Sequence, residues 1–144
     1  MGGNVGSART EAAAYRTQVR NIIGRLVADL GESWDNQDTA KPAAFYDTHA
    51  TITLGPAEPI EGRAAIRAAF ERQLGKMRGV IFMVHSFDMS DELAFASGTM
   101  SYELLNPDRP ATRVTAAFTL TLRTRKGDWM IQSHTIGGPP TLPD

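Results

Sequence analysis

Three histidines, at positions 49, 85 and 134, are the side chains of this sequence that ordinarily titrate near neutral pH. His134 lies inside an alternating run of apolar residues, so a position on the inner face of a strand is expected. A histidine there could act as a base or an acid, while the hydroxyl of Tyr102 or Tyr46 polarises a carbonyl group. His134 and Tyr102 are therefore the candidate catalytic residues. A structural role for His134, bonded to backbone or to a tyrosine, is the alternative.

The other histidines fit chemistry less well. His85 lies in a run whose inward and outward positions are ambiguous, and it is a candidate wall residue of a binding site. His49 begins a predicted strand and is expected to be solvated. The remaining candidates are aromatic or flexible side chains that suit the core or the wall of an apolar pocket. They are Trp34, Tyr46, Phe70, Met100 and Phe118.

The composition excludes several kinds of site. The chain has no cysteine, so disulfides, thiolate nucleophiles and cysteine-bound metals are ruled out. Scattered histidines and an incomplete calcium-loop pattern at residues 35–38 predict no metal. No phosphate-binding glycine loop and no Gly-x-Ser-x-Gly elbow occurs, so nucleotide cofactors and serine hydrolysis are disfavoured and no cofactor is expected.

The charge balance and the hydropathy indicate where the protein works. With 15 basic and 16 acidic side chains, the net charge of -1 creates no broad field for nucleic acid or an anionic membrane. No run approaches about 18 apolar residues, and the first residues lack a signal-peptide pattern. A soluble, cytoplasmic protein that binds neither nucleic acid nor membrane is expected.

Three helices are predicted in the first half of the chain. Apolar residues at positions 19, 22, 23, 26, 27 and 30 recur at helical spacing and predict a helix over residues 10–34, with Thr10 as N-cap. Thr39 is expected to cap a short second helix that carries Phe45 and Tyr46 on its inner side. Apolar residues at positions 66, 70 and 74 predict a third helix that ends near residue 75.

Alternation with a period of two predicts strands over residues 49–54, 80–89, 93–105, 113–125 and 129–136. The strand over 113–125 has two unlike faces. Its apolar face, which is expected to meet the helices, consists of Val114, Ala116, Phe118, Leu120 and Leu122. The opposite face is small and rich in threonine, and could pack against a second sheet in a homodimer.

This order of elements predicts an α+β fold in which a strongly curved, mixed or antiparallel sheet wraps around three N-terminal helices and leaves a cavity between them. The 144 residues suffice for one domain. We expect that domain over residues 9–139, with a disordered N-terminus over 1–8 and a tail over 140–144.

A set of short motifs carries a family resemblance. They are Trp34 with Asp38, Phe45-Tyr46-Asp47, the strand over 50–54, Gly62-Arg63 with Ile66 and Phe70, and the closing Gly127-Asp128-Trp129-Met130-Ile131. Over residues 22–139 the chain resembles the nuclear transport factor 2-like superfamily, which includes ketosteroid isomerases and SnoaL-like cyclases. Among its branches, the sequence looks most like the SgcJ-type proteins found with bacterial secondary metabolism. The resemblance implies a cone-shaped fold, a mostly apolar pocket open at one end and a homodimer formed through the sheet.

The catalytic groups of those relatives do not carry over. The resemblance places the isomerase tyrosine at Leu30, the carboxylate base at Leu54 and the buried acid near Thr119, and none of these residues has the required group. Leu30 and Leu54 therefore join the candidate ligand-binding residues. The acids between residues 93 and 122 are Glu103, expected to point away from the apolar face, and Asp108 in a loop, so the aspartate of SnoaL-like cyclases has no counterpart.

These observations favour a protein that binds a hydrophobic small molecule, such as a polyketide-like metabolite. Catalysis by this site would be isomerisation or cyclisation that uses His134 with Tyr102 or Tyr46. The alternative, from a different class, is a non-catalytic ligand carrier, or a dimerisation or assembly domain with a small or filled pocket.

Overall fold

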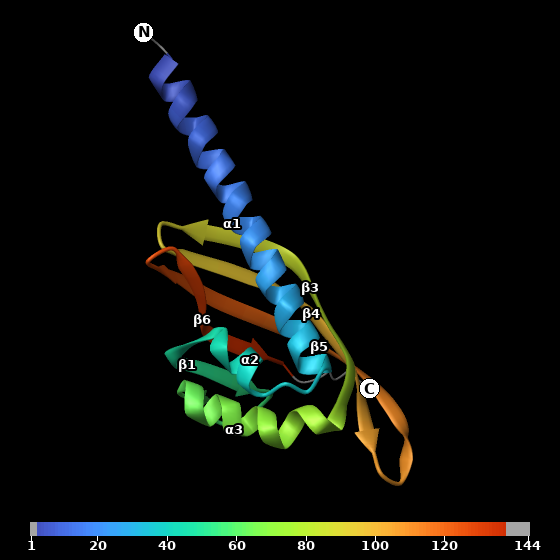
Figure 1. Cartoon of the computed structure of the whole chain (residues 1–144). Helices are drawn as coiled ribbons and strands as arrows, with labels where there is room; N and C mark the ends of the chain where they lie inside the picture. The colour runs from blue at the N-terminus through green and yellow to red at the C-terminus, as the bar shows by residue number, and fades with distance from the viewer. Residues whose placement is uncertain (1–2, 138–144) are drawn as a thin grey trace.

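One six-stranded sheet and the helices that cover one of its faces make up the computed structural model, which describes the backbone of residues 3–137 and the side chains of residues 9–137 (Figure 1). The helices are α1 (Gly3–Asp35), α2 (Ala40–Ala44) and α3 (Arg63–Gln73), followed by the 3₁₀ turn η1 (Leu74–Lys76). The strands are β1 (Tyr46–Leu54), β2 (Ile60–Glu61), β3 (Met77–Ser90), β4 (Leu93–Asn106), β5 (Arg109–Arg125) and β6 (Asp128–Ile136). The predicted α+β fold with a curved sheet is confirmed.

The sheet is mixed. Its strand order is β2-β1-β6-β5-β4-β3, and every neighbouring pair is antiparallel except β1 and β6, which run parallel. A parallel pair is possible here because residues 55–127 connect β1 to β6, whereas a short hairpin can join only antiparallel strands. It places the first strand of the chain beside the last one, so residues from both halves of the sequence share one inner face.

Three local predictions differ from the structure. The first helix begins at Gly3 rather than at Thr10. A threonine is favoured at the N-cap of a helix but also occurs inside helices, so its presence does not fix the start of the helix. Thr39 makes no capping bond; instead Asp38 Oδ1 accepts hydrogen bonds from the N–H groups of Ala40 and Lys41, each at 3.1 Å. Tyr46 begins β1 rather than lying on the second helix.

The predicted chain ends lie partly outside the described residues. This holds for residues 1 and 2 of the N-terminal segment and for the whole tail over 140–144. Between residues 3 and 8 the backbone is helical.

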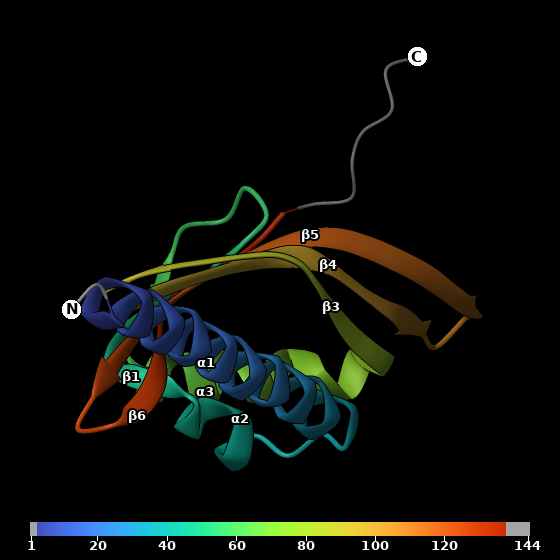
Figure 2. The same cartoon turned by 90° about the horizontal axis from the view of Figure 1, so that it is seen from above.

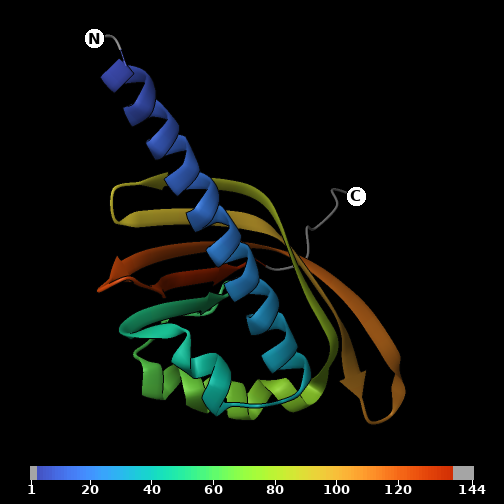
Figure 3. The same ribbon diagram turned by 45° about the horizontal axis from the view of Figure 1, so that its top comes forward.

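Helix α1 crosses the concave side of the sheet diagonally, as Figure 3 shows. Its buried stripe repeats at three- and four-residue steps, which is why one face of the helix meets the sheet. The stripe consists of Val19, Ile23, Val27, Leu30 and Trp34. The end of the helix is tied to β3, because Asp35 Oδ1 accepts hydrogen bonds from the N–H groups of Gly79 at 2.6 Å and Val80 at 3.4 Å. This tie fixes the depth at which Trp34 enters the interior.

The sheet arches over the helices, which all lie on its concave side (Figure 2). Strand β3 contains two shifts of register, one between Arg78 and Ile81 and one between Val84 and Ser86, and such bulges bend a strand and increase its twist. The second shift lies against Gly98 of β4. A Cβ atom at Gly98 would collide with the carbonyl oxygen of Met83, so only glycine allows β3 to approach this closely.

Replacing Gly98 by alanine should therefore destabilise the protein by about 1–3 kcal/mol, because the added methyl group forces β3 and β4 apart at the bend. The matched control is Gly24→Ala on α1, where nothing lies within 4 Å of the new Cβ atom. This control should stabilise the protein by about 0.5–1 kcal/mol through helix propensity. Urea denaturation of both variants measures the two effects, and a change of the same sign in both would contradict the explanation.

Candidate functional site

An aromatic cluster around Trp34 occupies the centre of the concave side. The Trp34 ring centroid lies 5.1 Å from that of Phe70 on α3, 5.2 Å from that of Phe82 on β3 and 5.9 Å from that of His134 on β6. The tilted and edge-on geometries are those that aromatic rings favour, each contributing about 0.5–1.5 kcal/mol beyond burial. The Trp34 side chain at the end of α1 thus contacts α3 and two separate strands of the sheet, β3 and β6.

His134 is fully buried, with none of its surface exposed to solvent. Its Nδ1 atom lies 2.7 Å from the hydroxyl oxygen of Tyr46, which is also fully buried. Cross-strand register places His134 beside Ile52 of β1 and Leu120 of β5. The inward position expected for His134 is thus the one observed, with Tyr46 as its hydrogen-bonding partner.

Burial keeps this pair uncharged. It lowers the pKa of His134 from 6.5 to about 3, because the imidazolium loses its hydration in the apolar interior. It raises the pKa of Tyr46 well above 10 for the same reason. Near neutral pH both groups are therefore neutral, and the hydrogen bond between them joins two neutral partners.

Two buried polar side-chain atoms in residues 9–137 have no hydrogen-bond partner, namely Trp34 Nε1 and His134 Nε2. Both belong to the aromatic cluster, and their rings are neighbours. A buried polar atom without a partner typically costs about 1–3 kcal/mol, so two such atoms on neighbouring rings are unusual for a folded protein.

A cavity of about 300 Å³ lies between the sheet, α3 and the end of α1. This volume is at the lower end of the range found for small-molecule sites. Its wall consists of Trp34, Ile52, Leu54, Gly55, Ala69, Phe70, Gln73, Leu74, Met77, Met100, Tyr102, Val114, Ala116, Ile136 and Gly137. None of these residues carries a charge, and Gln73 and Tyr102 supply the polar side-chain groups other than the indole of Trp34.

The structure divides the sequence candidates into three groups. Trp34, Leu54, Phe70, Met100 and Tyr102 line the cavity. Leu30, Tyr46, Phe118 and His134 are buried in the hydrophobic interior but do not belong to its wall. Since Ile52 and Ile136, the strand neighbours of His134, do line it, His134 lies directly behind the wall.

His85 lies elsewhere. It is exposed at the bulge of β3, and its Nε2 atom lies 2.9 Å from the hydroxyl oxygen of Thr99. It borders a separate surface depression with Arg20 and Phe87. The bulge explains the ambiguous parity of this residue, because an inserted residue reverses the alternation of side chains along a strand.

Several wall residues were missed by the sequence reasoning. Val114 and Ala116 share the predicted inner face of β5 with Phe118, so the alternation could have identified them. Ile52 and Ile136 could have been found in the same way on their own strands. Gln73, by contrast, gives no signal, because a polar residue at the end of a helix is ordinarily solvated.

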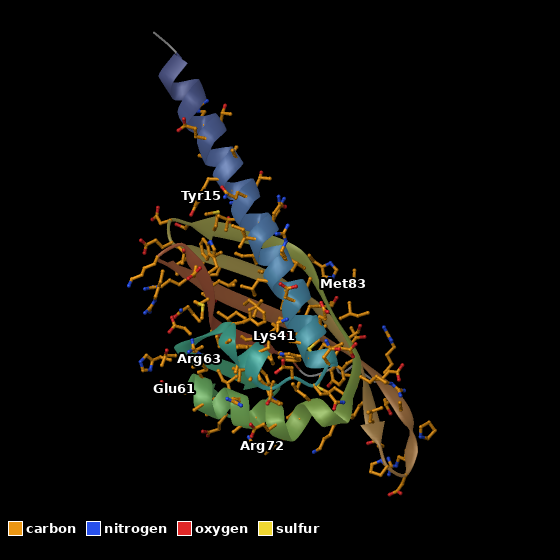
Figure 4. The ribbon with its side chains drawn as sticks, viewed as in Figure 1. Tyr15, Lys41, Glu61, Arg63, Arg72 and Met83 are labelled. Atoms are coloured by element: carbon orange, nitrogen blue, oxygen red, sulfur yellow. The ribbon has the colours of Figure 1, made fainter. Side chains whose placement is uncertain are left out.

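Charged side chains lie away from the cavity. Figure 4 shows Glu61, Arg63 and Arg72 around β2 and α3. Glu61 and Arg72 are exposed, and Arg63 is half-buried and donates a hydrogen bond from Nε to the carbonyl oxygen of Tyr46 at 2.9 Å. Glu103 forms an ion pair with Arg78 at 2.6 Å, in accordance with its predicted outward direction. Within residues 9–137 no three His, Asp or Glu side chains are arranged to hold a metal ion. None of the helices among the described residues has the length and hydropathy to span a bilayer.

Asp47 is the buried carboxylate of this region. A hydrogen bond from Gln132 Nε2, at 2.6 Å, lowers its pKa, and the guanidinium of Arg125 at 3.4 Å acts in the same direction. These contacts join β1 to β5 and β6, and Asp47 is not part of the cavity wall. The carboxylate therefore stabilises the sheet and does not supply a base to the cavity.

Comparison with known proteins identifies the fold. The model of the SnoaL-like domain matches residues 27–131. Aln2 from a Streptomyces species superposes with a TM-score of 0.74 at 16% identity, over 84% of this chain and 91% of that one. An NTF2-like protein from Cytophaga hutchinsonii gives 0.70 at 13% identity, over 83% and 97%. A ketosteroid isomerase-like protein from Erwinia carotovora gives 0.68 at 11% identity, over 76% and 88%.

At these identities the likeness to solved structures concerns the fold and not the chemistry of the site. No curated protein matches the sequence.

The buried histidine should give the stability a specific pH dependence. The pKa of His134 is about 3 in the folded protein and about 6.5 in the unfolded chain. The contribution of the neutral imidazole to the free energy of unfolding is therefore complete above about pH 6.5 and is lost as the pH falls towards 3. The wild type should lose up to about 1.4 kcal/mol per pH unit in this window, and His134→Gln should not. Urea denaturation between about pH 7 and 4.5 measures this.

Asp47 stays out of the comparison, because its pKa is lowered from 3.8 and this residue titrates below the window. Groups that the two proteins share cancel in the difference between their stability curves. Parallel stability curves for the wild type and His134→Gln would show that the histidine is not held neutral by burial.

Proposed function

The chain belongs to the SnoaL-like domain family, and we propose that it binds an uncharged, largely apolar small molecule in the cavity between the sheet, α3 and Trp34. The observation that carries this proposal is the composition of the cavity wall, which is apolar and free of charged side chains. Apolar walls with a few placed polar groups are typical of small-molecule sites.

The polar groups of the wall indicate the form of the ligand. Tyr102 is half-buried and Gln73 is exposed, so these two residues offer hydrogen bonds towards solvent. Met77 and Met100 add flexible thioether side chains that adapt to an irregular apolar shape. A fused-ring, polyketide-like metabolite without a carboxylate fits this arrangement.

The arrangement supports binding over acid–base catalysis. An efficient general base has a pKa near the working pH and lies within reach of the proton that it removes. His134 has a pKa of about 3 and lies behind the wall, and no carboxylate of residues 9–137 lines the cavity. The isomerase-equivalent positions agree with this: Leu54 lines the cavity without a base, and Thr119 is exposed on the outer face of β5.

We also propose that the protein forms a homodimer through the outer face of the sheet. Three large apolar side chains of this face are exposed, Ile81 by 52%, Met83 by 56% and Phe95 by 42%. Ile81 and Met83 of β3 pair with Ser101 and Thr99 of β4, which pair in turn with the small residues Thr115 and Ala117 of β5. Phe95 of β4 pairs with Thr121. Large side chains on the same face as small residues can interdigitate with a second copy, and exposed apolar patches of this kind mark interfaces.

Ligand charge provides the test of the binding function. Naphthalene should bind and raise the thermal stability, whereas 2-naphthoate should bind at least about tenfold more weakly, because the wall offers no cation for its carboxylate. Calorimetry and thermal unfolding with both compounds measure this difference. Native mass spectrometry of the purified protein should also reveal a bound neutral molecule. Equal affinity for the two compounds, or no binding of either, would contradict the proposal.

The proposed homodimer is tested by measuring the oligomeric state of two variants in solution. Met83→Lys should shift the protein from dimer to monomer at micromolar concentration, because the new charge would be buried in the interface. Ile22→Lys is the matched control, since Ile22 is an exposed apolar residue of α1 (41%) away from the outer face of the sheet. Light scattering coupled to size exclusion distinguishes the two states. A monomeric wild type would exclude the dimer.

A further inference from the structure

We propose that Trp34 Nε1–H and His134 Nε2–H form a pair of hydrogen-bond donors for an uncharged carbonyl oxygen of the ligand. The inference rests on the proposed binding function and extends it to the class of ligand, a neutral ketone or quinone. It begins from the two buried polar side-chain atoms without a partner in the described part of the chain, which belong to these two residues.

The hydrogen bond to Tyr46 determines which nitrogen of His134 carries the proton. The Tyr46 hydroxyl is fully buried, and its hydrogen-bond partner is Nδ1 of His134 at 2.7 Å. If Tyr46 O–H donates to Nδ1, the neutral imidazole carries its proton on Nε2. In the opposite tautomer Nδ1–H would donate to the Tyr46 oxygen. The Tyr46 O–H group and the lone pair of His134 Nε2 would then both lack a partner among the described residues. The first arrangement leaves fewer buried groups unsatisfied.

In this tautomer two buried donors lie together without an acceptor. The Trp34 and His134 rings are 5.9 Å apart between centroids and inclined by only 33°, so their N–H groups belong to one small region of the interior. A carbonyl oxygen has two lone pairs and can accept from both donors at once. A single oxygen atom therefore removes the cost of both unsatisfied groups.

The position of the pair relative to the cavity supports a ligand as the source of this oxygen. Trp34 belongs to the cavity wall, and the strand neighbours Ile52 and Ile136 of His134 do so as well. Both nitrogens are buried, so the ligand reaches them when a side chain of the wall moves. Met77 and Met100 of the wall have flexible side chains that permit such a movement.

A carbonyl group suits the region better than a water molecule does. A water molecule would accept from both donors, but it would bring two hydrogens of its own into a region walled by the rings of Phe70, Phe82 and Phe118. A ketone brings no hydrogen to be satisfied. A carboxylate would fit the donors but would remain an unpaired charge, because no cationic side chain of the described residues lines the cavity.

The experiment compares 9-fluorenone with fluorene, two compounds of nearly equal shape that differ by one carbonyl oxygen. The wild type should bind fluorenone more tightly, and Trp34→Phe should reduce the fluorenone-to-fluorene affinity ratio by about fivefold, the effect of one hydrogen bond. The ratio is the measured quantity because the loss of apolar contact with the smaller ring affects both compounds alike and cancels in it. The matched control is Trp129→Phe, since Trp129 is the other tryptophan, is buried on β6 and does not line the cavity. This control should leave the ratio unchanged.

A second measurement needs no variant. The infrared carbonyl stretch of fluorenone bound to the wild type should lie at lower frequency than in hexane, because two donors weaken the C=O bond. An unshifted stretch, or an equal affinity ratio in the wild type and in Trp34→Phe, would overturn the donor pair; a water molecule held by the two donors would give both results. Failure of both compounds to bind would instead overturn the proposed function.

Discussion

The packing of Trp34 is the contact on which the interior of this protein depends. The side chain stands on the last turn of α1 and contacts Phe70 of α3, Phe82 of β3 and His134 of β6. Asp35, its neighbour in the chain, holds the same helix end to the backbone of β3. Because the sheet is bent, its concave side is deeper than one layer of helical side chains can fill. The aromatic cluster fills one part of that depth, and the cavity occupies the remainder.

The buried side of the aromatic cluster and the side that borders the cavity differ in their chemistry. On the buried side, the Tyr46 hydroxyl and His134 Nδ1 share a hydrogen bond of 2.7 Å, and both side chains remain neutral, since burial opposes a charge on either. On the other side, the cavity wall is uncharged, and the family fold is present without carboxylates at the positions where ketosteroid isomerases carry them. The proposed ligand would be selected by shape and by neutral hydrogen bonds, and the unpartnered nitrogens of Trp34 and His134 are the proposed donors of those bonds.

The outer face of the same sheet has a different role. The bend that creates the cavity depends on the bulge of β3 against Gly98, and that bulge also turns His85 to the outer surface, where it contacts Thr99. Exposed Ile81 and Met83 lie on this strand as well. One local irregularity of β3 therefore shapes both the concave side, where the ligand is proposed to bind, and the convex side, where the partner subunit is proposed to pack.

The sequence by itself determined the order of the three helices and the five longer strands, the inner face of β5 and the apolar character of the interior, because these depend on local spacing that repeats every two or every three to four residues. The two-residue strand β2 was not predicted, since it is too short to show a period. It also placed Trp34, Phe70, Met100 and Tyr102 among the candidates that the structure brings to the cavity wall. Only the tertiary structure decided that Tyr46 meets His134, 88 positions away, and that His134 lies behind the wall rather than in it. These outcomes follow from the parallel pairing of β1 with β6 and from the depth of the bend, which no pattern along the chain encodes.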